Sequence, residues 1–175
     1  MKTIKYSFAL ILFSTLQFTA CTITDDGTYV APISISEKIQ GNWATISVNQ
    51  IDEVAKAIDK TTSPLYLTTQ FNFSTFNITF NVDATTNLPT TYQIGGSSPA
   101  LFPTQGYWNL ANLYPNTDTT PSQIILYSDA EKTVKTATLD ITTMPGAIKT
   151  LELRFTRKTK GIAFVSYTFK LSPTN

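Results

Sequence analysis

Along several stretches of this chain, every other residue is apolar, and this alternation constrains the fold more than any other feature. Successive side chains of a β-strand point to opposite faces, so a period of two predicts strands with one face in a core. The apolar positions are Phe76, Ile78, Phe80 and Val82 in residues 75–83, Leu151, Leu153 and Phe155 in residues 149–158, and Ala163, Val165, Tyr167, Phe169 and Leu171 near the carboxyl end. The abundant Thr, Tyr and Phe residues favour the same extended conformation.

The pattern predicts eight strands joined mostly by short connections. They cover residues 39–48, 75–83, 90–94, 106–110, 123–128, 132–140, 149–158 and 163–171. Short connections favour antiparallel neighbours, and eight such strands can close on themselves without leaving an exposed edge. We therefore expect an all-β domain over residues 39–175, an eight-stranded antiparallel up-and-down barrel, with a β-sandwich as the alternative.

One short helix is expected after the first strand. Residues 51–60 place Ile51, Val54, Ala55 and Ile58 at helical spacing, and Asn49 is the expected cap. Because Pro64 follows, the helix should end before it.

The chain has no histidine and one cysteine, which restricts its chemistry. Histidine-based catalysis, histidine metal ligands, internal disulfides and cysteine-based zinc sites are all excluded. The carboxylate pairs, Asp52-Glu53 and Asp129/Glu131, suit a helix start and a hairpin turn. We expect a protein that is not an enzyme, with no catalytic residues, no metal and no cofactor.

The first 20 residues have the layout of a signal peptide. Lys2 and Lys5 precede an uncharged stretch that ends at Ala20, and this stretch is shorter than the roughly 20 apolar residues of a spanning helix. Phe18-Thr19-Ala20-Cys21 resembles the lipobox of bacterial lipoproteins, although that pattern prefers an aliphatic residue in place of Phe18. The resemblance implies cleavage before Cys21 and lipidation of its thiol.

Residues 21–38 are rich in Thr, Ser, Asp and Pro, and we expect them to form a flexible tether between the lipid and the barrel. The acidic pair Asp25-Asp26 resembles the surface-export signal of Bacteroidota lipoproteins. These resemblances imply an exported, lipid-anchored protein of the outer membrane, facing either the periplasm or the cell surface. Its first partner is then the membrane itself.

Two Gly-x-Trp units stand at the start of predicted strands, at Gly41–Trp43 and Gly106–Trp108. The first is similar to the lipocalin signature, in which the tryptophan plugs one end of the barrel and an arginine covers it. That resemblance assigns the plug to Trp43 and the cover to Arg154 or Arg157.

The order of these features over most of residues 21–172 resembles the uncharacterised lipocalin-like lipoproteins, domains of unknown function, of gut Bacteroidota. The resemblance implies a fold and a location. It implies no activity.

Aromatic residues are the candidate binding groups, because sugar rings stack on them and barrel mouths often hold ligands. If Trp108 points inward, Tyr107 points outward, and we place Tyr107, Phe102 and Tyr114 near one barrel mouth. We expect a binding module for a glycan or a small apolar ligand. The alternative is a non-catalytic accessory subunit of an outer-membrane nutrient-uptake assembly, with an outer-membrane protein as partner.

Charge gives two further expectations. The net charge of +1 indicates no nucleic-acid partner. Residues 21–118 carry eight acids and three bases, whereas residues 119–175 carry four acids and eight bases, which favours pairing between the two halves. Separately, Asp118-Thr119-Thr120 resembles an O-glycosylation acceptor of Bacteroidota.

Overall fold

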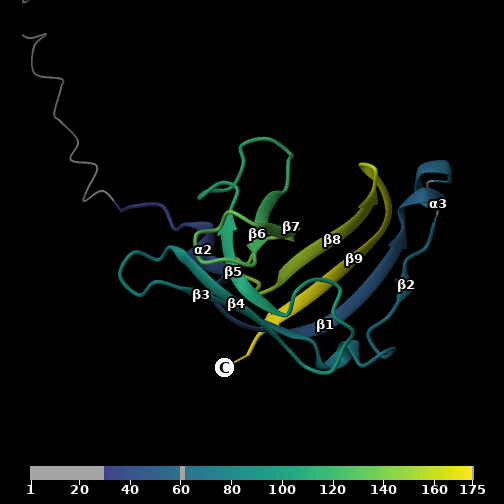
Figure 1. Cartoon of the computed structure of the whole chain (residues 1–175), viewed down its shortest axis with the longest axis horizontal. Helices are drawn as coiled ribbons and strands as arrows, with labels where there is room; N and C mark the ends of the chain where they lie inside the picture. The colour runs from purple at the N-terminus through teal and green to yellow at the C-terminus, as the bar shows by residue number, and fades with distance from the viewer. Residues whose placement is uncertain (1–29, 60–61, 175) are drawn as a thin grey trace, which may run out of the picture. The chain divides into compact units, whose positions relative to one another are not determined.

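The computed structural model describes residues 30–59 and 62–174 (Figure 1). The predicted signal peptide, Cys21 and the first half of the predicted tether therefore lie outside the described residues. Residues from Ile33 onward form one compact unit. Among the described residues, no helix is long and apolar enough to cross a membrane.

The described residues of this unit form nine strands and three short helical segments. The helical segments are α2 (Ile35–Ile39), α3 (Glu53–Ile58) and the 3-10 turn η2 (Phe73–Thr75). The strands are β1 (Gly41–Asp52), β2 (Leu65–Tyr66), β3 (Asn77–Val82), β4 (Pro89–Gly95), β5 (Gln105–Leu110), β6 (Ser122–Tyr127), β7 (Lys135–Thr143), β8 (Leu151–Thr159) and β9 (Ile162–Pro173).

The strands form a closed antiparallel barrel. From β3 to β9 each strand pairs with the next, and β1 pairs with both β3 and β9, which closes the ring at eight strands. The short strand β2 adds to β1 through Asn49↔Tyr66 and Gln50↔Leu65. The predicted eight-stranded up-and-down barrel is confirmed, and the closure between β1 and β9 decides against the sandwich.

Period-two burial fills this barrel as the sequence predicted. Leu151 and Leu153 on β8 are buried, as are Phe169 and Leu171 on β9. Phe76 stacks on Phe169 with ring centroids 4.7 Å apart. The apolar rows of the strands therefore share one interior.

The folded unit begins before the predicted domain boundary at residue 39. Ser34 caps α2 in a capping box, in which its hydroxyl accepts from the Glu37 backbone N–H and the Glu37 carboxylate accepts from the Ser34 N–H. Ile35 and Ile39 are fully buried. The last residues of the predicted tether are thus part of the core.

The predicted helix over residues 51–60 is shorter and begins later, at Glu53. Asn49 lies inside β1, where it pairs with Tyr66 of β2 and Thr168 of β9, so it cannot cap a helix. The cap is Asp52, whose side chain accepts hydrogen bonds from the N–H groups of Val54 and Ala55. No residue of α3 is buried, so the apolar spacing there does not mark a core face.

Candidate functional site

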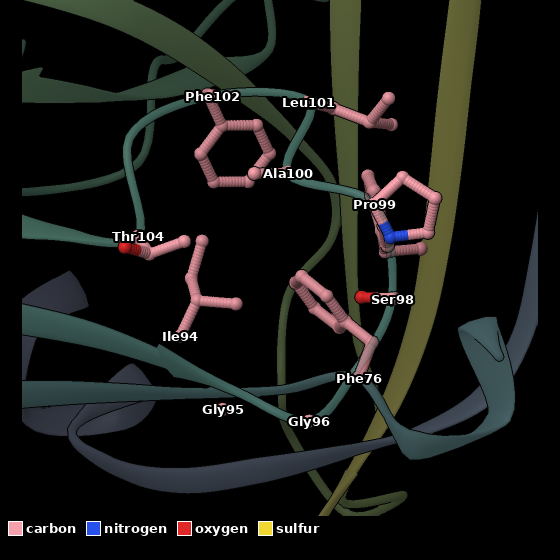
Figure 2. Close-up of a pocket in the computed structure, with 11 residues that line it drawn as sticks. Phe76, Ile94, Gly95, Gly96, Ser98, Pro99, Ala100, Leu101, Phe102 and Thr104 are labelled. Carbon is pink, nitrogen blue, oxygen red and sulfur yellow. The ribbon is translucent and has the colours of Figure 1, made fainter. Parts of the chain in front are cut away.

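The mouth of the barrel where β4 meets β5 is covered by the chain's own loop. Residues 96–104 arch over it, and Figure 2 shows Phe102 in this loop. Phe102 is buried against Phe155 and Phe169, with ring centroids 5.3 and 6.2 Å away. The remaining cavity beneath the loop has a volume of about 30 Å³. That space suits a water molecule or two, whereas ligand pockets usually measure roughly 300–1,000 Å³.

The three aromatic residues predicted to share a binding site lie in three different places. Phe102 belongs to the core. Tyr107 is on the outer face of β5, because Trp108 beside it is fully buried in the barrel. Tyr114 lies in the loop between β5 and β6, at the opposite end from the loop that carries Phe102, and is 43% exposed. The predicted grouping at one mouth is therefore not what the fold produces, because alternation fixes the face of a residue and not the end of the barrel.

Trp43 lies at the end of the barrel where α2 packs. Its indole N–H donates to the Ile39 carbonyl oxygen at 2.7 Å, and the side chain is buried. The arginines predicted to cover it lie elsewhere. Arg154 is on the outer side of β8, 3.8 Å from Asp140, and Arg157 stands over the Phe164 ring, 5.7 Å from its centroid. Helix α2 thus takes the place expected of an arginine.

The carboxylate pairs have local structural roles. Asp52 caps α3, and Glu53 accepts a hydrogen bond from the Ser166 hydroxyl and lies 3.9 Å from Lys56. Asp129 accepts from the backbone N–H groups of Thr133 and Val134, which lower the pKa of its carboxyl in that order. In the part of the chain that the structure describes, no three His, Cys, Asp or Glu residues gather as a metal site would require.

A large opening lies in the barrel wall, between β7 and β8. The ladder between these strands runs from Thr143↔Glu152 to Leu139↔Phe155 and stops there. Over the described residues, 135–138 have no partner on β8 and 156–159 have none on β7. The strands diverge into a cleft of about 560 Å³, which we call the β7–β8 cleft. It is lined by Gln123, Lys135, Thr136, Ala137, Thr138, Asp140, Phe155, Thr156 and Lys158.

The β7–β8 cleft has a mixed surface with an excess of positive charge. Lys135 and Lys158 line it from opposite strands. Its acid, Asp140, accepts from the Gln123 side-chain amide at 2.8 Å and lies beside Arg154. The Arg154 Nε and the Thr156 hydroxyl are buried without a hydrogen-bond partner.

The sequence carries a signal for this cleft that the predicted strands do not use. Residues 156–160, Thr-Arg-Lys-Thr-Lys, have no apolar side chain on either face. A strand segment that covers a core shows an apolar row, so its loss at residue 156 indicates that this part of β8 leaves the barrel.

Asp118-Thr119-Thr120 lies in the loop between β5 and β6, and all three residues are exposed. The Thr120 N–H donates to the Asp118 carboxylate at 2.9 Å. Glycosylation of this tripeptide stays a prediction.

Comparison with known proteins identifies a family whose function is unknown. A family model described as "Domain of unknown function (DUF5004)" matches residues 17–172, most of the chain. No curated protein and no solved structure matches it.

Proposed function

The chain belongs to the DUF5004 family of domains of unknown function, and we propose that it is an exported, lipid-anchored protein that acts by binding another protein of the cell envelope. In this role it is a non-catalytic accessory subunit of an outer-membrane assembly, such as one that takes up nutrients. The side-chain-filled barrel carries this proposal.

The filled interior favours protein binding over ligand carriage. A carrier of a glycan or an apolar ligand needs a pocket, and the covered mouth leaves about 30 Å³. Phe102 occupies the position that a ligand would need. The outer surface is then where recognition takes place.

Exposed apolar side chains on β9 and on two elements outside the barrel, α3 and β2, support the same role. Ile58 on α3 is 83% exposed, Ile162 on β9 is 71% exposed, and Leu65 and Tyr66 on β2 are also exposed. Figure 1 shows β8, β9 and β1 running side by side toward this end, where β2 and α3 follow. Apolar groups gathered on a surface favour association with a partner.

The location is proposed from the amino-terminal sequence. Lys2 and Lys5 before the uncharged stretch direct export, and Cys21 after Ala20 accepts the lipid. Each buried methylene of an acyl chain contributes about 0.8 kcal/mol, so several chains anchor the protein firmly.

Photo-crosslinking in cells that make the anchored protein tests the proposal. A photoreactive amino acid replaces Ile162 in one variant and Ile148, an equally exposed residue of the β7–β8 loop at the other end, in the control. We expect a discrete adduct with one envelope protein from position 162, a much weaker adduct from position 148, and loss of both membrane retention and adduct in Cys21→Ser.

Two results would contradict the proposal. One is the absence of any adduct from position 162 while the protein is at the membrane. The other is a saturable change in the fluorescence of buried Trp43 and Trp108 when fatty acids or oligosaccharides are added, because this would show a ligand inside the barrel.

A further inference from the structure

We propose that the β7–β8 cleft binds an extended acidic segment of the partner protein, which pairs as an added strand with the free edge of β8 over residues 156–159. The inference rests on the proposed function as a protein-binding subunit, and it names the binding mode and the chemistry of the partner.

Residues 156–159 of β8 have a strand partner on one side only. On one side, residues 156–159 pair with β9, through Thr156↔Ser166 at one end and Thr159↔Ile162 at the other. On the other side, the ladder with β7 has ended at Phe155. The outward-facing N–H and C=O groups of this edge are a template for another strand, and extended peptides commonly bind by adding to such an edge. An added strand would take the position that β7 leaves.

Charge selects the segment. Lys135 and Lys158 line the cleft together with one acid, Asp140, and the Arg154 guanidinium lies 3.8 Å from that acid. Arg157 and Lys160 lie on the same strand and turn, and both are exposed. Like charges oppose pairing of this edge with a second copy of itself, whereas an acidic segment meets complementary charge.

The cleft also has an apolar side. Ala137 and Phe155 line it where the strands diverge. The Phe155 ring packs against the buried Phe102 ring, with the centroids 5.3 Å apart. Side chains of an added strand alternate between two faces, so one row would meet this apolar side and the other the lysines. The expected segment therefore alternates apolar with acidic residues.

Peptide binding to the full chain tests the inference. The probe is a fluorescent ten-residue peptide that alternates valine with glutamate. The comparison peptides alternate valine with lysine, or carry proline at two central positions, which removes two backbone N–H donors. By fluorescence anisotropy we expect the glutamate peptide to bind at least tenfold more tightly than either. Hydrogen exchange should slow at those backbone N–H groups of residues 156–159 that face away from β9 when it binds.

Matched variants locate the binding site. Lys158→Glu, at an exposed position in the cleft, should weaken binding of the glutamate peptide at least fivefold. Lys149→Glu makes the same charge change in the loop at the other end of β8 and should leave the affinity within twofold. Circular dichroism of both variants checks that the fold is retained.

Several outcomes would overturn the inference. They are no binding of the glutamate peptide, equal binding of the proline peptide, equal loss in both lysine variants, or Lys158-dependent binding of an acidic polysaccharide when the peptide does not bind. If any one of these outcomes is found while the crosslinked adduct from position 162 persists, the strand-pairing inference fails and the proposed protein-binding function stands.

Discussion

At the scale of single residues, the second Gly-x-Trp unit shows why both its glycine and its tryptophan are needed. Trp108 is fully buried, lies 5.0 Å from the Phe80 ring centroid, and donates its indole N–H to the Asn81 carbonyl oxygen at 2.8 Å. At Gly106, an added Cβ would lie 2.3 Å from the Tyr127 carbonyl oxygen, so no larger residue fits there. The tryptophan therefore fills the barrel interior, and its indole N–H makes a partly buried hydrogen bond.

Neighbouring aromatic residues on β5 should differ strongly in their contribution to stability. Trp108→Ala removes a buried ring and a hydrogen-bond donor and should lower the free energy of unfolding by about 3–5 kcal/mol. Tyr107→Ala removes a side chain from the outer face and should cost less than about 1 kcal/mol. Urea unfolding followed by circular dichroism measures both values, and similar losses in the two variants would show that the inward and outward assignment is wrong.

At the scale of secondary-structure elements, the strands could be predicted because each carries its own apolar row. Leu151, Leu153 and Phe155 mark the face of β8 without any knowledge of its neighbours. Helix α2 has five residues, which are too few to show a helical period of apolar residues. Ser34 and Glu37, however, have the spacing of a capping box, which marks the start of a helix. This signal could have moved the predicted domain boundary to its observed place.

The candidate site was less predictable than the fold. The position of Phe102 depends on the path of the loop over residues 96–104, and loop paths leave no periodic trace in a sequence. Gly96 illustrates this, because its φ of +93° and its approach to the Thr75 carbonyl oxygen depend on a segment about 20 residues away. The point where β7 and β8 part likewise depends on pairing between strands.

The role of α2 gives a prediction with a closely matched control. Ile35 is fully buried, whereas Ile33, two residues earlier, is 61% exposed. Ile35→Ala should lower the free energy of unfolding by about 2–5 kcal/mol, and Ile33→Ala should change it by less than about 0.5 kcal/mol. Urea unfolding of both variants measures the difference. If Ile35→Ala were as mild as Ile33→Ala, residues 33–39 would be part of the tether after all.

At the scale of the whole molecule, hydrogen-bonded carboxylates make folding sensitive to acid. The pKa of Asp83 is lowered, first by the backbone N–H of Thr86 and then by the Thr86 hydroxyl and the Thr85 N–H. Hydrogen bonds likewise lower the pKa of Glu37, Asp118 and Asp129. A lowered pKa in the folded state means that the ionised form stabilises the fold. This stabilisation is complete above the unfolded pKa of about 4 and is lost as the pH falls through the folded value.

The free energy of unfolding should therefore stay nearly constant from about pH 5 to 8, where a chain without histidine has few titrating side chains, and should fall below about pH 4. Urea unfolding at a series of pH values measures this profile. In the double variant Asp83→Asn/Asp129→Asn, the free energy of unfolding should fall less steeply below about pH 4, which is the acid limb of the profile. Glu131→Gln, in the same loop as Asp129, serves as the charge control. An acid limb that is unchanged in the double variant would rule out these carboxylates as its source.

The pairing of β1 with β9 also sets the order of events during biosynthesis. Val48 pairs with Phe169 and Asp52 with Val165, so the first barrel strand meets its partner more than 100 residues later along the chain. Contacts so distant in sequence slow folding, because a long loop must close before they form. Because β9 is synthesised last, the ring cannot close until nearly the whole chain has left the ribosome, so the nascent polypeptide stays an open chain throughout its synthesis.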